Sequence, residues 1–100
     1  MNEVETFIDN FKSQYKDEIE VVFTEGNCYY FAVILKERFK GTIYYLPIEN
    51  HFICRIDGLY YDIKGLVKLD ETPIDWEELE QQDAAHYKRI VRDCITKLQQ

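Results

Sequence analysis

Apolar side chains follow a helical period near the start of the chain. They recur at positions 4, 7, 8, 11 and 15, and acidic residues fill the first turn, where the positive end of a helix dipole favours them. This pattern predicts an amphipathic helix over residues 4–15. Beyond it, residues 20–23 contain two β-branched valines and a phenylalanine, which favours a short strand or an extended lead-in to the next element.

The longest apolar run, residues 28–35, predicts a second helix that ends near Phe39. An ordinary surface helix shows one apolar stripe, whereas this run leaves no polar face, so we expect most of the helix to be enclosed. Gly26 and Asn27 precede it and suit a helix start, because glycine is conformationally permissive and asparagine is a good N-cap.

A β-hairpin is the clearest pattern in the middle of the chain. Gly41 suits the end of the central helix, and the β-branched and aromatic residues 42–46 favour a strand. Two further strands, 51–56 and 59–63, flank the pair Asp57-Gly58, which favours a two-residue hairpin turn.

The last third of the chain predicts one more strand and two helices. Residues 64–69 can begin a strand, and residues 72–75 form a turn. A short helix over 76–82 follows, with Asp75 as its cap, and then a longer one over 84–98 with a broad apolar face. This order of elements predicts an α+β fold in which the central helix packs on a small antiparallel sheet.

Pairing through the Asp57-Gly58 turn places His51 and Asp62 on the same face of the hairpin, because side chains alternate between faces. The apolar face, which must meet the core, carries Phe52, Cys54, Ile56, Leu59, Tyr61 and Ile63. The mixed face carries His51, Ile53, Arg55, Tyr60, Asp62 and Lys64. There His51 and Asp62 are diagonal neighbours, roughly 7–8 Å apart at the backbone, which their side chains can span.

These residues form a catalytic hypothesis together with Cys28. The amides at a helix N-terminus stabilise a thiolate, and a carboxylate beside an imidazole fixes its tautomer and supports the imidazolium. Cys28 would be the nucleophile, His51 the base and Asp62 the group that orients it. The alternative is that Cys28 is a small core residue. The hypothesis requires the N-terminus of the central helix to face His51.

The other cysteines and histidine carry no comparable pattern. Cys54 lies on the apolar hairpin face and Cys94 on the apolar face of the last helix, so both are interpreted as structural. Three cysteines without a C-x-x-C pair do not indicate a disulfide framework. The cysteines and histidines, His86 included, also lack the paired spacing of zinc ligands, so we expect no metal and no cofactor.

Length and charge narrow the class of protein. One hundred residues, 1–100, make one domain, and the net charge of −7 argues against nucleic acid, which needs a basic face. The acids gather in segment 70–83, which we interpret as a solvated face, or alternatively as a strip that binds a protein partner. The polar N-terminus is no signal peptide and no run is long enough to span a membrane, so we expect a cytoplasmic protein.

Two stretches resemble the transglutaminase-like branch of the papain-like cysteine enzymes. Residues 26–32, Gly-Asn-Cys-Tyr-Tyr-Phe-Ala, are similar to that family's nucleophile motif at the start of a helix. Residues 50–63 are similar to its histidine strand, glycine-containing turn and aromatic strand that ends in the aspartate. The resemblance implies a papain-like (transglutaminase-like) minimal core.

It also implies acyl-transfer chemistry at a peptide or side-chain amide through a thioester on Cys28: a thiol protease, amidase or transglutaminase-like hydrolase. The oxyanion hole would use the Cys28 amide with a second donor from Asn27 or Tyr29. The family's glutamine upstream of the cysteine has no counterpart in residues 20–26. The alternative is therefore a weak or inactive module of this fold that binds a protein, and a weaker one is a small inhibitor or immunity-type protein.

Overall fold

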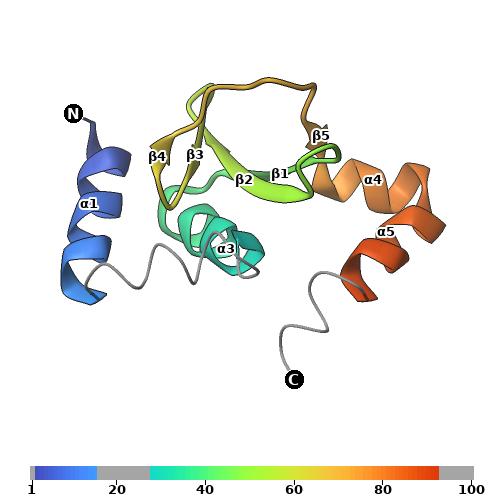
Figure 1. Ribbon diagram of the computed structural model, residues 1–100, viewed down its shortest axis with the longest axis horizontal. Coiled ribbons are helices and arrows are strands. Elements are labelled where there is room, and N and C mark those ends of the chain that lie inside the picture. The colour runs from blue at the N-terminus through green and yellow to red at the C-terminus, as the bar shows by residue number, and fades with distance from the viewer. Residues whose placement is uncertain (1, 16–27, 93–100) are drawn as a thin grey trace.

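The computed structural model describes residues 2–15 and 28–92 of the chain (Figure 1). The described part folds into helices and a five-stranded sheet. In chain order the elements are α1 (Glu3–Tyr15), α3 (Cys28–Phe39), β1 (Thr42–Leu46), β2 (His51–Ile56), β3 (Leu59–Asp62), β4 (Gly65–Leu66), β5 (Ile74–Asp75), α4 (Trp76–Gln82) and α5 (Ala84–Ile90).

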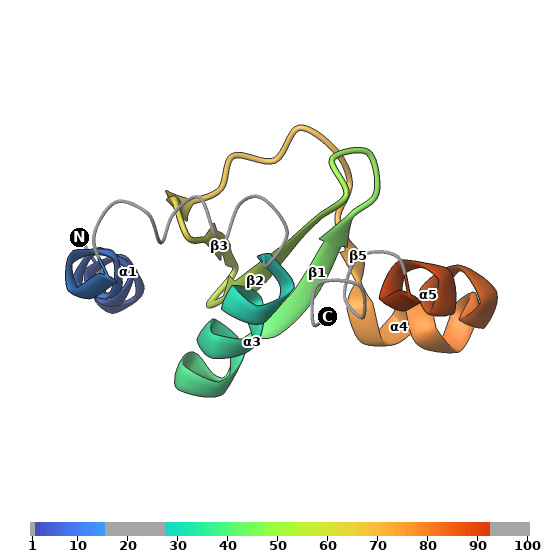
Figure 2. The same cartoon turned by 60° about the horizontal axis from the view of Figure 1, so that its bottom comes forward.

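The sheet is open and antiparallel, with strand order β4-β3-β2-β1-β5. Helix α3 lies across the middle of one face, against β2, while α1 lies beside the β4 edge and α4 and α5 lie beside the β5 edge (Figures 1 and 2). The α+β architecture with a central helix on a small antiparallel sheet is therefore confirmed. None of the helices in the described part of the chain is long and apolar enough to cross a membrane.

The core is built where α3 meets the sheet. Phe31, Ala32 and Leu35 of α3 are buried, and they pack in one cluster with the inward side chains of β1, β2 and β3. At one end of this cluster aromatic rings pack against one another, in edge-on and tilted arrangements. Trp76 lies at the centre, with ring centroids 4.8 Å from Phe52 and 4.4 Å from Tyr87. Such contacts fix the start of α4 against the sheet.

Burial along the hairpin does not follow the two assigned faces at two positions. Ile53, assigned to the mixed face, is fully buried, and Leu59, assigned to the core face, is 46% exposed. Leu59 lies beside the turn, where the sheet extends past the core. Alternation fixes which face a side chain takes, but the depth of burial depends on what covers that face.

The segment 72–75 is the clearest difference from the predicted elements. It was expected to be a turn, but Ile74 and Asp75 form β5 and pair with Tyr45 and Tyr44 of β1. A two-residue strand has no periodicity of its own, so only this long-range pairing defines it. The strand predicted over 64–69 is limited to β4, and Gly65 has a positive φ of 110° there.

The end of α3 also differs in detail from the expectation. The residue in the left-handed conformation is Lys40, with φ 57°, and Gly41 follows it with its N–H donating to the Lys36 carbonyl at 3.3 Å. This is the hydrogen-bond pattern of a Schellman motif. Gly41 is needed for another reason, because a Cβ there would lie 2.5 Å from the Sγ of Cys54. The strand predicted over 20–23 and the last turns of the helix predicted over 84–98 lie outside the described residues.

Candidate cysteine, histidine and aspartate site

The hairpin brings His51 and Asp62 into direct contact. Its strands pair with Cys54 opposite Tyr61, which is the register that the sequence predicted. The turn residues Asp57 and Gly58 have φ of 52° and 83°, as a two-residue turn between twisted strands requires. The Nε2 of His51 lies 2.9 Å from the Oδ2 of Asp62, and both side chains are 16% exposed. The predicted contact is therefore present.

The Asp62 carboxylate is held from both sides. Its Oδ1 accepts a hydrogen bond from the backbone N–H of Lys64 at 2.8 Å, while its Oδ2 faces the imidazole. The backbone then bends at Gly65 into β4. Since each oxygen has its own donor, the carboxylate is fixed in the orientation that places one lone pair on His51.

Cys28 approaches His51 from helix α3. It is the first residue of α3, it is half-buried, and its side chain is near enough to His51 to help raise the pKa of the imidazole. Asp62 occupies Nε2, which leaves Nδ1 as the ring nitrogen available to Cys28. The imidazole thus bridges a sulfur on a helix N-terminus and a carboxylate on a strand end. The site requires this packing of α3 against the hairpin, and the structure has it.

Both neighbours change the charge state of His51. The hydrogen bond to Asp62, and after it the hydrogen bond to Cys28, raise the pKa of His51 from 6.5 to about 10, although partial burial opposes the rise. The imidazole therefore carries both protons at neutral pH. A cation placed between sulfur and carboxylate is the arrangement that can stabilise a thiolate and later return a proton.

A small cavity of about 270 Å³ opens beside the pair. Its lining comes from the hairpin and the turns on either side of it, and consists of Glu49, Asn50, His51, Asp62 and Lys64. The volume is below the usual range for ligand pockets, which is about 300 to 1,000 Å³. It therefore admits a short polar group rather than a large apolar one, and it gives solvent access to the imidazole.

The two residues considered for the oxyanion hole have different outcomes. Asn27 lies outside the described residues. The ring of Tyr29 packs into the aromatic cluster, 5.1 Å from Phe52 and 6.3 Å from Trp76 between centroids. Its side chain is thus engaged in packing, whereas its backbone N–H belongs to the first turn of α3, where amides have no acceptor within the helix. That amide is the part of Tyr29 that can serve as a donor.

The remaining cysteines are not at this site. Cys54 is fully buried between α3 and the sheet, and burial raises the pKa of its thiol from 9.0 to about 11. Cys94 lies outside the described residues. Within residues 2–15 and 28–92, no group of three His, Cys, Asp or Glu side chains lies close enough to hold a metal ion.

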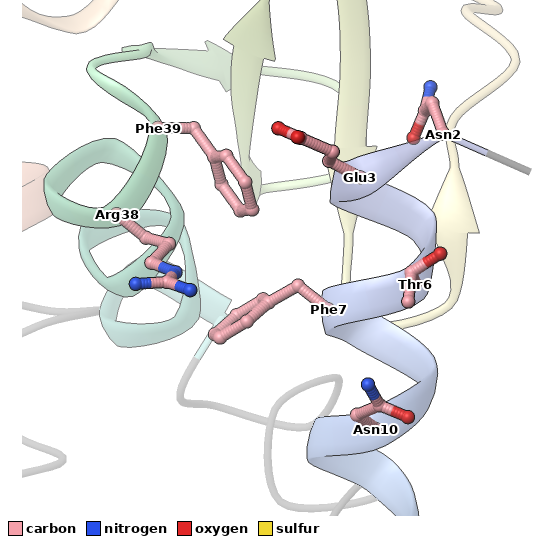
Figure 3. Close-up of a pocket in the computed structure, with 7 residues that line it drawn as sticks. All are labelled: Asn2, Glu3, Thr6, Phe7, Asn10, Arg38 and Phe39. Atoms are coloured by element: carbon pink, nitrogen blue, oxygen red, sulfur yellow. The ribbon is translucent and has the colours of Figure 1, made fainter.

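A second cavity lies between α1 and the C-terminal end of α3 (Figure 3). It measures about 550 Å³, and Phe7, Phe39 and Arg38 point into the space between the helices. The guanidinium of Arg38 lies 5.7 Å from the centroid of the Phe7 ring. The described lining includes neither a thiol nor an imidazole, so this cavity has no nucleophile and base to compare with those at Cys28 and His51.

Comparison with known proteins gives one match. A family model described as Phage YunG-like protein matches residues 4–98. No curated protein matches the chain, and no solved structure matches it. The assignment to the transglutaminase-like, papain-like family is therefore wrong, because the matching family is a different one. Its two motifs, a cysteine before an apolar helix and a hairpin with histidine and aspartate, are too short to define a family, and the papain-like form of the fold has no support from these comparisons.

Proposed function

This chain belongs to the Phage YunG-like family, and we propose that it is a cysteine hydrolase or acyltransferase that acts on an amide. One observation carries the proposal. The His51 imidazole contacts the Asp62 carboxylate at 2.9 Å and lies close to the Cys28 side chain at the start of α3. A nucleophile, a base and a group that orients the base are the minimum for nucleophilic catalysis of acyl transfer.

In the first step the Cys28 sulfur attacks the carbonyl carbon of the amide, and a C–S bond forms as the carbonyl oxygen becomes an oxyanion. Amides of the first turn of α3, such as that of Tyr29, would stabilise that oxyanion. His51 donates its proton to the leaving nitrogen, the C–N bond breaks, and a thioester remains on Cys28. Asp62 keeps the imidazole ring in place throughout.

In the second step a water molecule or an amine attacks the thioester carbon. His51 takes the proton of the attacking group, the C–S bond breaks, and the sulfur leaves as a thiolate beside the imidazolium that has formed again. With water the product is an acid, and with an amine it is a new amide. The cavity of about 270 Å³ beside His51 is not lined by Cys28, so the proposal of a peptide amide or a side-chain amide as the substrate rests on the chemistry of the thiol and the imidazole.

Thiol labelling tests the proposal without knowledge of the substrate. The protein is treated with limiting iodoacetamide between pH 5.5 and 8, and the labelled cysteine is identified by peptide mapping. We expect Cys28 to be labelled first and to stay reactive in mildly acidic buffer, because a thiolate paired with an imidazolium persists there. Cys28→Ala abolishes this labelling, whereas Cys54→Ala and Cys94→Ala serve as matched controls and retain it.

Equal and slow labelling of all three cysteines would refute the proposal and would favour a non-catalytic module that binds a protein. A second measurement examines the chemistry itself. A panel of peptide amides is incubated with the protein, and an acyl adduct on Cys28 is sought by intact mass. We expect hydroxylamine to release such an adduct, since it cleaves thioesters.

A further inference from the structure

The turn that leads into His51 is held by a residue far away in the sequence. The carboxylate of Glu71 accepts two backbone hydrogen bonds, one at 2.8 Å from the N–H of Ile48 and one at 3.0 Å from the N–H of Glu49. Each carboxylate oxygen takes one of them. Hydrogen bonds from backbone amides to a carboxylate are stronger than those between neutral groups. Glu71 thus holds the turn between β1 and β2 in place, and we call this pair of hydrogen bonds the Glu71 clamp.

Both ribbon views agree with this contact. The segment that joins β4 to β5 passes beside the turn between β1 and β2 before it enters β5 (Figures 1 and 2). The turn has little apolar packing to fix it otherwise. All four of its residues, 47–50, are exposed, and the side chain of Ile48 is 84% exposed.

The clamped residues are directly connected to the catalytic candidates. Asn50 follows Glu49 in the left-handed conformation, with φ 54°, and its Oδ1 accepts a hydrogen bond from the Tyr45 hydroxyl. His51 is the next residue. Glu49 and Asn50 also line the cavity beside His51 and Asp62. A shift of the turn would therefore move the imidazole and one wall of the cavity together.

We infer that Glu71 is a positioning residue, whose carboxylate sets the place of His51 relative to Cys28 through the turn 47–50. This inference rests on the proposed function. Glu71 belongs to the acidic segment 70–83, which was interpreted as a solvated face, yet its carboxylate would position a residue of the Cys28, His51 and Asp62 site. The charged groups around His51 are Asp62 and Cys28, in contact with it, and Glu49 and Lys64 across the cavity.

The test compares Glu71→Gln with Asp70→Asn, which removes the same charge from the adjacent, exposed residue. Glutamine keeps only one carbonyl oxygen, so one of the two amides loses its acceptor. A misplacement of a catalytic group by about 1 Å can cost about a hundredfold in rate, and we expect Cys28 alkylation at pH 6 to fall about ten- to a hundredfold in Glu71→Gln. Asp70→Asn should keep the wild-type rate, and Glu71→Asp should restore part of it because both oxygens are retained.

Nuclear magnetic resonance separates positioning from simple loosening of the turn. Hydrogen exchange of the Ile48 and Glu49 amides reports the clamp, and titration of the His51 imidazole reports its surroundings. We expect both to change in Glu71→Gln and neither in Asp70→Asn. Faster exchange with an unchanged titration and an unchanged pH profile of alkylation would overturn the inference, since Glu71 would then only shape the turn.

The same data distinguish this inference from the proposed function. If wild-type Cys28 reacts as an ordinary thiol but the His51 titration still shifts in Glu71→Gln, the proposed function fails and the positioning role remains. If wild-type Cys28 reacts as an ordinary thiol and the His51 titration is the same in Glu71→Gln as in the wild type, both the proposed function and the positioning role fail. Thermal unfolding of each variant shows whether it is folded, and Glu71→Asp replaces Glu71→Gln in the comparison if the glutamine variant is not.

Discussion

Cys28 begins α3 and Cys54 packs near the other end of the same helix, and the two sulfurs have different surroundings. Cys28 is at the N-terminus of the helix, half-buried, and close to the His51 imidazole, whose pKa is raised to about 10. Cys54 lies near the other end of the helix, beside Gly41, and is fully buried, with a raised pKa of about 11. Burial without a cation favours the neutral thiol, whereas a nearby cation and helix amides favour the thiolate.

The comparison shows that β2 contributes residues both to the candidate site and to the core around Cys54. His51 and Cys54 are three residues apart on β2, and alternation places them on opposite faces. His51, at the start of β2, lines a cavity that opens to solvent. Cys54, in the middle of the strand, packs in the hydrophobic core. The residue type is the same at 28 and 54, so the difference comes from position and partners alone.

The largest effect should come from removal of the base. His51→Gln leaves a polar side chain of similar size but no group that can take and return a proton. General acid–base catalysis contributes roughly 10² to 10⁴ in rate, and we expect a loss of that order in amide turnover, with slower Cys28 alkylation at pH 6. In the same variant Cys54 should remain protected from alkylation by its burial. Mass spectrometry of both cysteines after timed alkylation checks the contrast, and an unchanged Cys28 rate would contradict it.

Asp62→Asn should have the next largest effect. The hydrogen bond to Asp62 is the largest cause of the raised pKa of His51, so the asparagine variant should titrate at a lower pH. The imidazole also loses the partner that fixes its tautomer, and we expect turnover to fall by about a hundredfold or more. Titration of the His51 ring by nuclear magnetic resonance measures the shift. Asp57→Asn, in the exposed hairpin turn, is the matched control and should leave the titration unchanged.

A third change acts on the Cys54 region alone. In Gly41→Ala the new Cβ would lie 2.5 Å from the Cys54 Sγ, 2.7 Å from the Arg55 carbonyl oxygen and 2.9 Å from the Ile56 Cγ1. Overpacking of this kind costs about 1–3 kcal/mol, so the unfolding free energy should fall by that amount. Denaturant unfolding measures it.

The double variant Gly41→Ala with Cys54→Ala sharpens the comparison. It removes one of the three close contacts, so the two substitutions should be less destabilising together than their sum. Cys28 alkylation in folded Gly41→Ala should match the wild type, because its partners lie at the other end of α3. Loss of Cys28 reactivity in a variant that is still folded would show that the two regions are coupled.

The sequence was most informative where a local rule fixed a long-range contact. Alternation and a two-residue turn determine the hairpin register, and the contact of His51 with Asp62 follows from that register. The start of α3 at Cys28 was predicted from the apolar run. Both depend on neighbours within about a dozen residues of one another, which is the range that periodicity describes.

What the sequence missed depends on contacts between distant segments. Glu71 lies in an acidic run that was interpreted as a solvated face or a partner strip, and its acceptor role becomes visible only when the turn 47–50 lies beside it. Asp75 and Asp83 in the same run accept backbone hydrogen bonds at the starts of α4 and α5, and only the first of these caps was predicted. Gly41 was assigned to the end of a helix, but its close approach to Cys54 comes from tertiary packing.

The smallest expected effect concerns stability against pH. The pKa of His51 is raised in the folded protein from 6.5 to about 10, so its charged form stabilises the fold fully below pH 6.5, and this contribution is lost as pH rises toward 10. After allowance for solvent screening at a partly exposed pair we expect the loss to be on the order of 1 kcal/mol. Cys54, whose pKa rises from 9.0 to about 11, acts in a later window above pH 9. Thermal midpoints between pH 6 and 8.5 therefore cover the His51 window without that of Cys54, and they should fall more in the wild type and in Cys54→Ala than in His51→Gln.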